Sequence, residues 1–193
     1  MCGLAGIYSH KPVATELYDS LIHLQHRGQD AAGITTYNKH MHKTKGLGLV
    51  RDIFTEKKIK RLKGNVGIAH TRYPTHGGFG HGEIQPFWTS VPYGIALAHN
   101  GNLTNYNELA KNITSKESRY LNTNSDTEVL LHLFAELLHD RNKHDNDKEF
   151  FDNLCSVLEN IYKHVRGAYS VIALVIGKGL VAFRDPLGIR ALV

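Results

Sequence analysis

Residues 1–7 read Met-Cys-Gly-Leu-Ala-Gly-Ile, a short apolar run with glycines that predicts a β-strand extending to Tyr8. A strand that starts at the second residue is expected to hold this end of the chain within the fold. A cysteine in such a place is usually a small hydrophobe. If Met1 is removed, however, Cys2 carries both a thiol and a free α-amino group, which can act as a base near neutral pH. This stretch therefore predicts a side-chain nucleophile activated by the chain's own amine.

Hydrophobic periodicity predicts three helices outward from this strand. Thr15 is expected to cap the first helix, and Ser125 and Glu128 form a capping box at the start of the second. In the third, Cys155 is expected to pack on or near an apolar stripe. The predicted helices cover residues 15–26, the segment that follows Asn124, and residues 151–162.

Short apolar runs bounded by polar clusters or glycines predict the strands. After residues 2–8, the predicted strands are 32–38, 41–49, 66–70, 95–99, 169–176 and 180–184. Tight turns join the first two of these and the last two into hairpins. Strands and helices mix without a regular βαβ alternation, so the sequence predicts an α+β fold with antiparallel sheets and helices packed outside them.

The composition bounds the class of protein. A length of 193 residues suits one domain, and no apolar run approaches a membrane span. The net charge of +5 is scattered. Its densest stretch, residues 57–63, lacks interleaved aromatic residues, so a solvated face is favoured over a nucleic-acid patch. Cys2 and Cys155 give neither a disulfide framework nor a metal knuckle, so we expect a cytoplasmic protein.

Histidines and glycines raise two further possibilities. His70, His76, His81 and His99 lack a recognisable metal-ligand spacing and are expected in a pocket or the core. The glycines within residues 77–82 are not followed by the Lys-Ser/Thr of a phosphate-binding loop. They favour a flexible lid at residues 73–82, over a pocket.

Six motifs, each modest alone, occur in one order along the chain. They are Met-Cys-Gly-Leu-Ala-Gly-Ile (1–7), Leu-Gln-His-Arg-Gly-Gln-Asp-Ala-Ala-Gly (24–33), His-Thr-Arg-Tyr-Pro-Thr (70–75), Ala-His-Asn-Gly-Asn-Leu (98–103), Asn-Ser-Asp-Thr-Glu (124–128) and Phe-Arg-Asp-Pro-Leu-Gly-Ile-Arg (183–190). Together they resemble the N-terminal glutaminase domain of the glutamine phosphoribosylpyrophosphate amidotransferases (amidophosphoribosyltransferases), and the match runs from residue 2 to the last residues.

The resemblance implies a fold and an activity. The fold is that of an N-terminal-nucleophile hydrolase, a four-layer α/β/β/α sandwich of two antiparallel sheets over residues 2–193. The activity is hydrolysis of glutamine to glutamate and ammonia through a Cys2 thioester. Ammonia would then serve a phosphoribosyltransferase domain, absent from this chain, in the first step of purine synthesis. The resemblance implies no cofactor for the glutaminase half, Mg²⁺ only in that absent domain, and a homo-oligomer at full length. Nucleic acid and membrane are not expected as partners.

The resemblance also assigns roles near the nucleophile. Asn100 and Gly101 can be read as a plain Asn-Gly turn. In the family, the Asn side-chain amide and the Gly backbone N–H instead form an oxyanion hole. Arg27 can be a structural arginine; in the family it lies near the nucleophile and helps order the site.

Substrate recognition is assigned in the same way. Arg72 would bind the α-carboxylate of glutamine with its planar fork of donors. Asp126 would receive the α-ammonium, although an Asp in a first helical turn is also explained by the helix dipole. Thr75 and His76 would line the glutamine pocket.

Two other interpretations remain open from the sequence. A glucosamine-6-phosphate synthase-like enzyme shares the glutaminase half, but such enzymes typically carry Tyr-Arg-Gly-Tyr-Asp and Arg-Trp-Ala-Thr. This chain has His-Arg-Gly-Gln-Asp and Arg-Tyr-Pro-Thr. A non-catalytic scaffold domain of the same fold is the other, and the intact set of expected site residues disfavours it.

Overall fold

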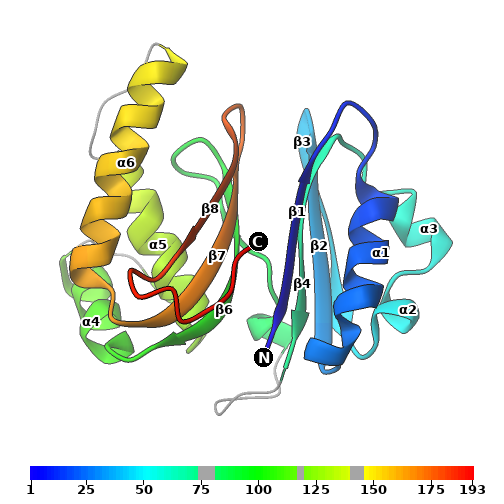
Figure 1. Ribbon diagram of the computed structural model, residues 1–193, viewed down its shortest axis with the longest axis horizontal. Coiled ribbons are helices and arrows are strands. Elements are labelled where there is room, and N and C mark those ends of the chain that lie inside the picture. Colours follow the sequence, from blue (N-terminus) through cyan, green and yellow to red (C-terminus); the bar gives the residue numbers. More distant parts are fainter. Residues whose placement is uncertain (74–80, 117–119, 140–145) are drawn as a thin grey trace.

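Two antiparallel sheets lie face to face, and helices cover the outer face of each (Figure 1). The computed structural model describes residues 1–73, 81–116, 120–139 and 146–193. Within them, each sheet has four strands. Both chain ends lie in the region between the two sheets (Figure 1). The layers confirm the predicted α+β class and its α/β/β/α order.

The first sheet has the strand order β1-β4-β2-β3. Its hairpin turns at Lys39, whose positive φ of 57° lies where the sequence predicted the turn. The first helix continues into a 3₁₀ turn, η1 (Gln25–Arg27). The elements of this half are β1 (Gly3–Tyr8), α1 (Ala14–Leu24), β2 (Ala31–Asn38), β3 (His40–Leu47), α2 (Val50–Ile53), α3 (Glu56–Ile59) and β4 (Val66–Arg72).

The second sheet has the order β5-β6-β7-β8. Its short first strand, and the 3₁₀ turn that precedes this strand in the chain, are not predicted by the sequence. The elements of this half are η2 (His81–Glu83), β5 (Phe87–Thr89), β6 (Ile95–Leu103), α4 (Tyr106–Lys116), α5 (Asp126–His139), α6 (Asp147–His164), β7 (Gly167–Val175) and β8 (Gly179–Arg184). Helices α4, α5 and α6 cover its outer face (Figure 1).

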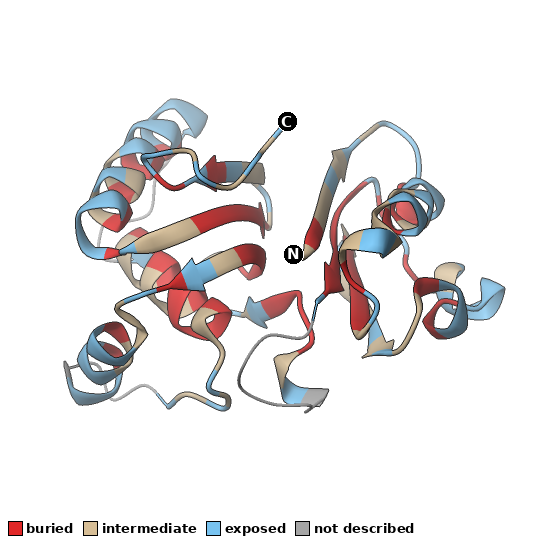
Figure 2. Ribbon diagram, turned by 60° about the horizontal axis from the view of Figure 1, so that its bottom comes forward, coloured by how far each residue is buried: buried red, intermediate tan, exposed pale blue. Residues whose placement is uncertain are grey.

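Three buried clusters separate the four layers, and the central strands contribute to two of them (Figure 2). Side chains alternate between the faces of a strand. Along β6, Ile95 and Leu97 therefore pack against the helices, whereas Ala96 and Ala98 face the first sheet. The next residue in this second series is Asn100. Along β1, Leu4 also packs in the cluster between the sheets, and Cys2 precedes it in the same phase.

Two local predictions are wrong. The residue that caps α1 is Val13, and Thr15 lies inside the helix. Cys155 is exposed on α6, because the buried stripe runs through Phe150, Leu154 and Val157 and leaves the following position outside. In the described part of the chain, no helix is long and apolar enough to cross a membrane.

Candidate active site

Cys2 and Asn100 meet across the space between the two sheets. Cys2 directly precedes β1 of the first sheet, and Asn100 lies in β6 of the second. The backbone nitrogen of Cys2 donates a hydrogen bond to the side-chain oxygen of Asn100, with 3.1 Å between the atoms. The α-nitrogen of the predicted nucleophile is thus held by a residue predicted to stabilise an oxyanion.

Asn100 and Gly101 are part of a strand, so the alternative of a plain Asn-Gly turn is wrong. They pair with Ser170 and Tyr169 of β7. At Gly101 the neighbouring strand comes so close that a Cβ would collide with the carbonyl oxygen of Ala168. Glycine is therefore required by packing at this position. The oxyanion-hole role stays a prediction.

The Cys2 thiol is half-buried, and its surroundings act on it in opposite directions. Burial raises the pKa of the Cys2 thiol, and the nearby Asp126 carboxylate adds to this. The Tyr73 backbone N–H, the terminal ammonium and the Arg72 guanidinium lower that pKa but do not cancel the effect of burial. Because the thiol keeps its proton at neutral pH, attack by sulfur needs a base.

A cavity of about 480 Å³ opens beside Cys2, a size suited to a small molecule. Two cationic and two acidic side chains line it, which suits a ligand carrying both charges. The lining residues are Cys2, Arg72, Tyr73, Glu83, Gln85, His99, Gly101, Asn102, Leu103, Tyr106, Asn124, Ser125, Asp126 and Arg190.

Arg72 ends β4 on the wall of this cavity, and its side chain is almost completely buried. Its Nη1 lies 3.2 Å from Asp30 Oδ2, and its Nη2 lies 2.6 Å from Glu83 Oε2. A buried guanidinium needs such partners. The predicted residue therefore lies in the cavity, held on two sides by carboxylates.

Asp126 begins α5 and lies next to the end of β6. Its Oδ2 accepts a hydrogen bond from the backbone N–H of Leu103 at 3.1 Å, and its Oδ1 lies 3.5 Å from His99 Nδ1. Burial acts to raise the pKa of Asp126, but the His99 side chain and backbone N–H groups outweigh it and lower that pKa. Asp126 is therefore a carboxylate at neutral pH, facing the cavity.

His99 and His70 are core histidines, as predicted. His70 is fully buried, and burial lowers its pKa to about 3, with the neighbouring His99 and Arg72 acting in the same direction. Its imidazole is therefore neutral at physiological pH. The backbone N–H of His99 donates to the Gln85 side-chain oxygen at 2.6 Å. This bond ties the second sheet to the segment that crosses from the first.

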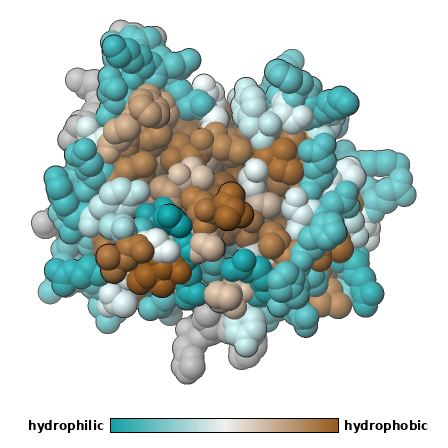
Figure 3. Space-filling view, in the orientation of Figure 1, coloured by the Kyte–Doolittle hydropathy of each residue, from teal (hydrophilic) through white to brown (hydrophobic). Residues whose placement is uncertain are grey.

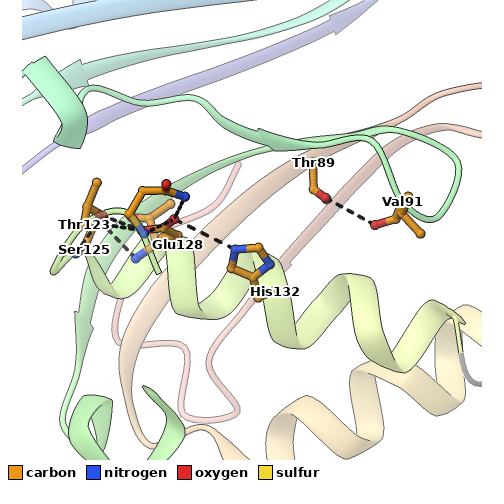
Figure 4. Close-up of polar contacts among 8 residues, drawn as sticks. Thr89, Val91, Thr123, Ser125, Glu128 and His132 are labelled. Carbon is orange, nitrogen blue, oxygen red and sulfur yellow. Dashed lines mark hydrogen bonds and ion pairs between the residues drawn. The ribbon is translucent and has the colours of Figure 1, made fainter. Parts of the chain in front are cut away.

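Glu128 fixes the loop before α5 (Figure 4). Its carboxylate accepts hydrogen bonds from the backbone and side chain of both Asn122 and Thr123, at 2.7 to 3.0 Å. The Ser125 hydroxyl caps α5 by accepting from the Thr127 N–H at 3.3 Å. The Ser125 N–H, however, donates to the Thr123 hydroxyl and not to Glu128, so the reciprocal half of the predicted capping box is wrong. Glu128 instead reaches past Ser125 and holds the loop that carries Asn124 along the cavity wall.

A second cavity, of about 380 Å³, also adjoins Cys2. It runs between the sheets and is lined mostly by apolar side chains, and apolar residues gather across the middle of this face of the molecule (Figure 3). Arg27, at the end of η1, lines it together with Cys2 and Asn100. Arg27 is thus near the nucleophile, but it does not line the cavity that Arg72 and Asp126 line.

The structure brings together six of the eight predicted site residues. Thr75 and His76 lie outside the described residues, as does most of the predicted lid. Three cavity residues lie outside the motifs found in the sequence, namely Glu83, Gln85 and Tyr106, and a fourth, Arg190, ends the last motif but was assigned no role. Within the described ranges, no group of three or more His, Cys, Asp or Glu side chains could hold a metal ion.

The model of the "Glutamine amidotransferase domain" family matches residues 79–193. The chain belongs to this glutamine amidotransferase family. As a glutamine amidotransferase domain, it is also similar over its full length to larger curated proteins. It is 48% identical over 198 residues to the amidophosphoribosyltransferase of Escherichia coli and 46% identical over 197 residues to that of Saccharomyces cerevisiae. The chain spans 38% of the length of these relatives.

Solved structures resemble this glutamine amidotransferase domain. The glutamine phosphoribosylpyrophosphate amidotransferase of B. subtilis, solved with ADP and GMP, has a TM-score of 0.77 at 30% identity. The match covers 98% of this chain and 38% of that chain. A glutamine amidotransferase predicted for Pseudomonas aeruginosa has a TM-score of 0.59 at 15% identity and shows the fold alone. The N-terminal-nucleophile hydrolase fold expected from the motifs is confirmed.

Proposed function

We propose that this domain is the glutaminase half of an amidophosphoribosyltransferase and hydrolyses glutamine to glutamate and ammonia, with Cys2 as the nucleophile. The observation that carries the proposal is the contact between the Cys2 nitrogen and Asn100, 3.1 Å across the two sheets. In the structure this nitrogen belongs to the Met1–Cys2 peptide bond. Removal of Met1 would turn it into an amine beside the thiol, which is the base that the buried sulfur needs.

The reaction balances with the groups at this site. The Cys2 amine takes the thiol proton as sulfur bonds to the side-chain amide carbon of glutamine. The Asn100 side-chain amide and the Gly101 N–H would hold the resulting oxyanion. The carbon–nitrogen bond breaks, the amine returns the proton to nitrogen, and ammonia leaves a thioester. Water then hydrolyses the thioester, releasing glutamate and restoring the thiol.

The charged cavity supports recognition of the amino-acid end of glutamine. In our proposal, Arg72 binds the α-carboxylate and Asp126 the α-ammonium, with Thr75 and His76 as further pocket residues. Arg72 and Asp126 line the same cavity as Cys2. A guanidinium presents paired donors to a carboxylate, and an ionised carboxylate accepts from an ammonium.

The fate of ammonia is proposed from the relatives. Both named amidophosphoribosyltransferases are more than twice as long as this chain. A phosphoribosyltransferase domain outside it would use ammonia to make 5-phosphoribosylamine, the first step of purine synthesis, with Mg²⁺ required there and no cofactor here. We further propose a cytoplasmic homo-oligomer as the working form. The relatives' names favour this acceptor over that of glucosamine-6-phosphate synthase.

The test is product release by the purified protein. Incubation with glutamine should yield glutamate and ammonia in equal amounts, and Cys2→Ala should abolish both. Cys155→Ala is the matched control, since this exposed thiol lies on a helix far along the chain. Equal activity in wild type and Cys2→Ala would exclude the mechanism, and inactivity of the wild type after loss of Met1 would exclude the function.

A further inference from the structure

The two carboxylates on Arg72 differ in how they are built into the fold. Asp30 directly precedes β2, and its backbone is fixed twice. Its N–H donates to the Arg72 carbonyl at 3.1 Å, and its own carbonyl accepts from Gly48 N–H at 2.8 Å. Asp30 is not part of the cavity lining. It holds the guanidinium from the side of the sheet.

Glu83 approaches Arg72 from the cavity. It ends the three-residue turn η2 and lines the same cavity as Cys2 and Asp126. Its Oε2 lies 2.6 Å from Arg72 Nη2, whereas the Asp30 carboxylate lies 3.2 Å from Arg72 Nη1. Both carboxylates are largely buried, with side-chain exposures of 16% for Asp30 and 18% for Glu83. The cavity side of the guanidinium is therefore occupied by a carboxylate of the chain itself.

The Glu83 carboxylate is the same chemical group as the α-carboxylate of glutamine, which Arg72 is proposed to bind. An α-carboxylate and a glutamate side chain present the same two oxygens to a guanidinium. One guanidinium already faces two carboxylates here, so a third would enter a locally negative cluster. In a partly buried site, such repulsion is weakly screened. A ligand carboxylate can avoid it by taking the place of Glu83.

We propose that Glu83 is an internal competitor for the substrate's α-carboxylate at Arg72 and thereby sets the apparent affinity and selectivity of the site. This inference rests on the proposed function and refines its substrate recognition. A ligand must displace Glu83 to reach Arg72, so binding costs more than it would at an empty guanidinium. Only a ligand that also supplies an α-ammonium to Asp126 recovers that cost in full. Asp30 remains in place throughout and orients the guanidinium.

The proposal predicts opposite effects at the two carboxylates. Glu83→Gln keeps the size of the side chain but weakens its hold on Arg72, so KM for glutamine should fall about three- to tenfold, as expected when a charge-assisted hydrogen bond becomes one to a neutral amide oxygen. Asp30→Asn removes the orienting partner, so KM should rise. If Glu83 merely orients Arg72, both substitutions raise KM. An unchanged or higher KM in Glu83→Gln overturns the proposal.

A second substrate separates competition from a structural effect. L-Glutaminamide carries the same reacting amide and α-ammonium but no α-carboxylate. Glu83→Gln should therefore lower KM for glutamine and leave that for glutaminamide within about twofold. An equal decrease for both compounds would show a general loosening of the cavity and overturn the proposal.

Direct binding makes the result independent of turnover. In a Cys2→Ala background, calorimetric titration with glutamine should give a lower Kd when Glu83→Gln is added. Glu83→Asp is the fallback if the amide variant unfolds: its carboxylate is one methylene shorter, so Kd should again fall. Wild-type glutamate release is measured in parallel. Its absence would remove the proposed function, whereas normal release with no gain in Kd would remove only the role of Glu83.

Discussion

The nitrogen of Cys2 lies 3.1 Å from the side-chain oxygen of Asn100, although the two residues belong to different sheets. The bond uses the amide oxygen of Asn100 and leaves its NH₂ group to serve as a donor. One side chain can therefore hold the proposed base and face the reacting carbonyl at once. This dual role makes the first two predictions specific.

Retention of Met1 should inactivate the protein. A peptide nitrogen has no lone pair available to accept the thiol proton, while burial raises the pKa of the thiol and keeps it protonated. We expect the rate of glutamate release to follow the fraction of molecules lacking Met1. Intact-mass spectrometry and activity measured on the same samples check this. Full activity in protein that still carries Met1 would contradict the mechanism.

Asn100→Ala should lower kcat more than it changes KM. An oxyanion-hole donor bonds its target fully only in the transition state, and its loss costs about 10²–10³-fold in kcat. Steady-state kinetics of glutamate release measures both constants. Asn107→Ala, at an exposed position of α4, is the control. A change confined to KM would assign Asn100 to ground-state binding instead.

Arg72→Lys should raise KM for glutamine by about tenfold, because an ammonium keeps the charge but loses the planar fork of donors. It also cannot span Asp30 and Glu83 as the guanidinium does. Arg51→Lys tests the same exchange at an exposed arginine and should have no effect. Unaltered KM in Arg72→Lys would move the α-carboxylate to another cation of the cavity, such as Arg190.

Glu128 should make stability depend on pH in the acidic range. Burial acts to raise its pKa, but hydrogen bonds from Asn122 and Thr123 outweigh it and lower the pKa below the ordinary value of 4.5. A depressed pKa stabilises the folded state above the unfolded-state pKa, and this contribution is lost as pH falls through the folded-state value. The stabilisation is therefore present at neutral pH and disappears below about pH 4.5.

Chemical denaturation across that range tests the Glu128 prediction. Glu128→Gln should lower the free energy of unfolding by about 1.5–3 kcal/mol at neutral pH, since it removes charge-assisted hydrogen bonds from a buried group. The difference from wild type should shrink as the pH is lowered. Glu159→Gln, at an exposed position of α6, should show neither effect. A difference that stays constant with pH would exclude ionised Glu128 as the cause.

Local sequence signals predicted most elements, and each failure has its own physical cause. Alternation and turn residues located both hairpins, including the turn at Lys39. The Glu128 half of the capping box failed because Glu128 has four donors available in the preceding loop, and a spacing rule does not detect them. Cys155 failed because a one-residue error in helical phase moves a side chain from the core to solvent.

At the candidate site, too, some residues could be predicted from the sequence and others could not. Motifs supplied Cys2, Asn100 and Asp126, because their chemistry is attached to recognisable stretches of sequence. Glu83 lies in a segment without periodicity, and its partner Arg72 is 11 residues away across a change of sheet. Nothing in the sequence marks that pairing. The Arg72–Glu83 pair becomes apparent only in the three-dimensional structure.

The small cluster between the sheets gives the site a mechanical dependence. Ile68 and Ile172 come from different sheets and pack in this cluster, which fills the layer that Cys2 and Asn100 face. The thickness of this cluster sets the distance between Cys2 at the first sheet and Asn100 in the second. Ile172→Val would change catalysis by changing the distance between the two sheets, although no chemical group of the site is altered. The apolar layer between the sheets therefore fixes the distance between the proposed base and the Asn100 side chain, and substitutions in this layer are expected to lower activity as substitutions in the site itself do.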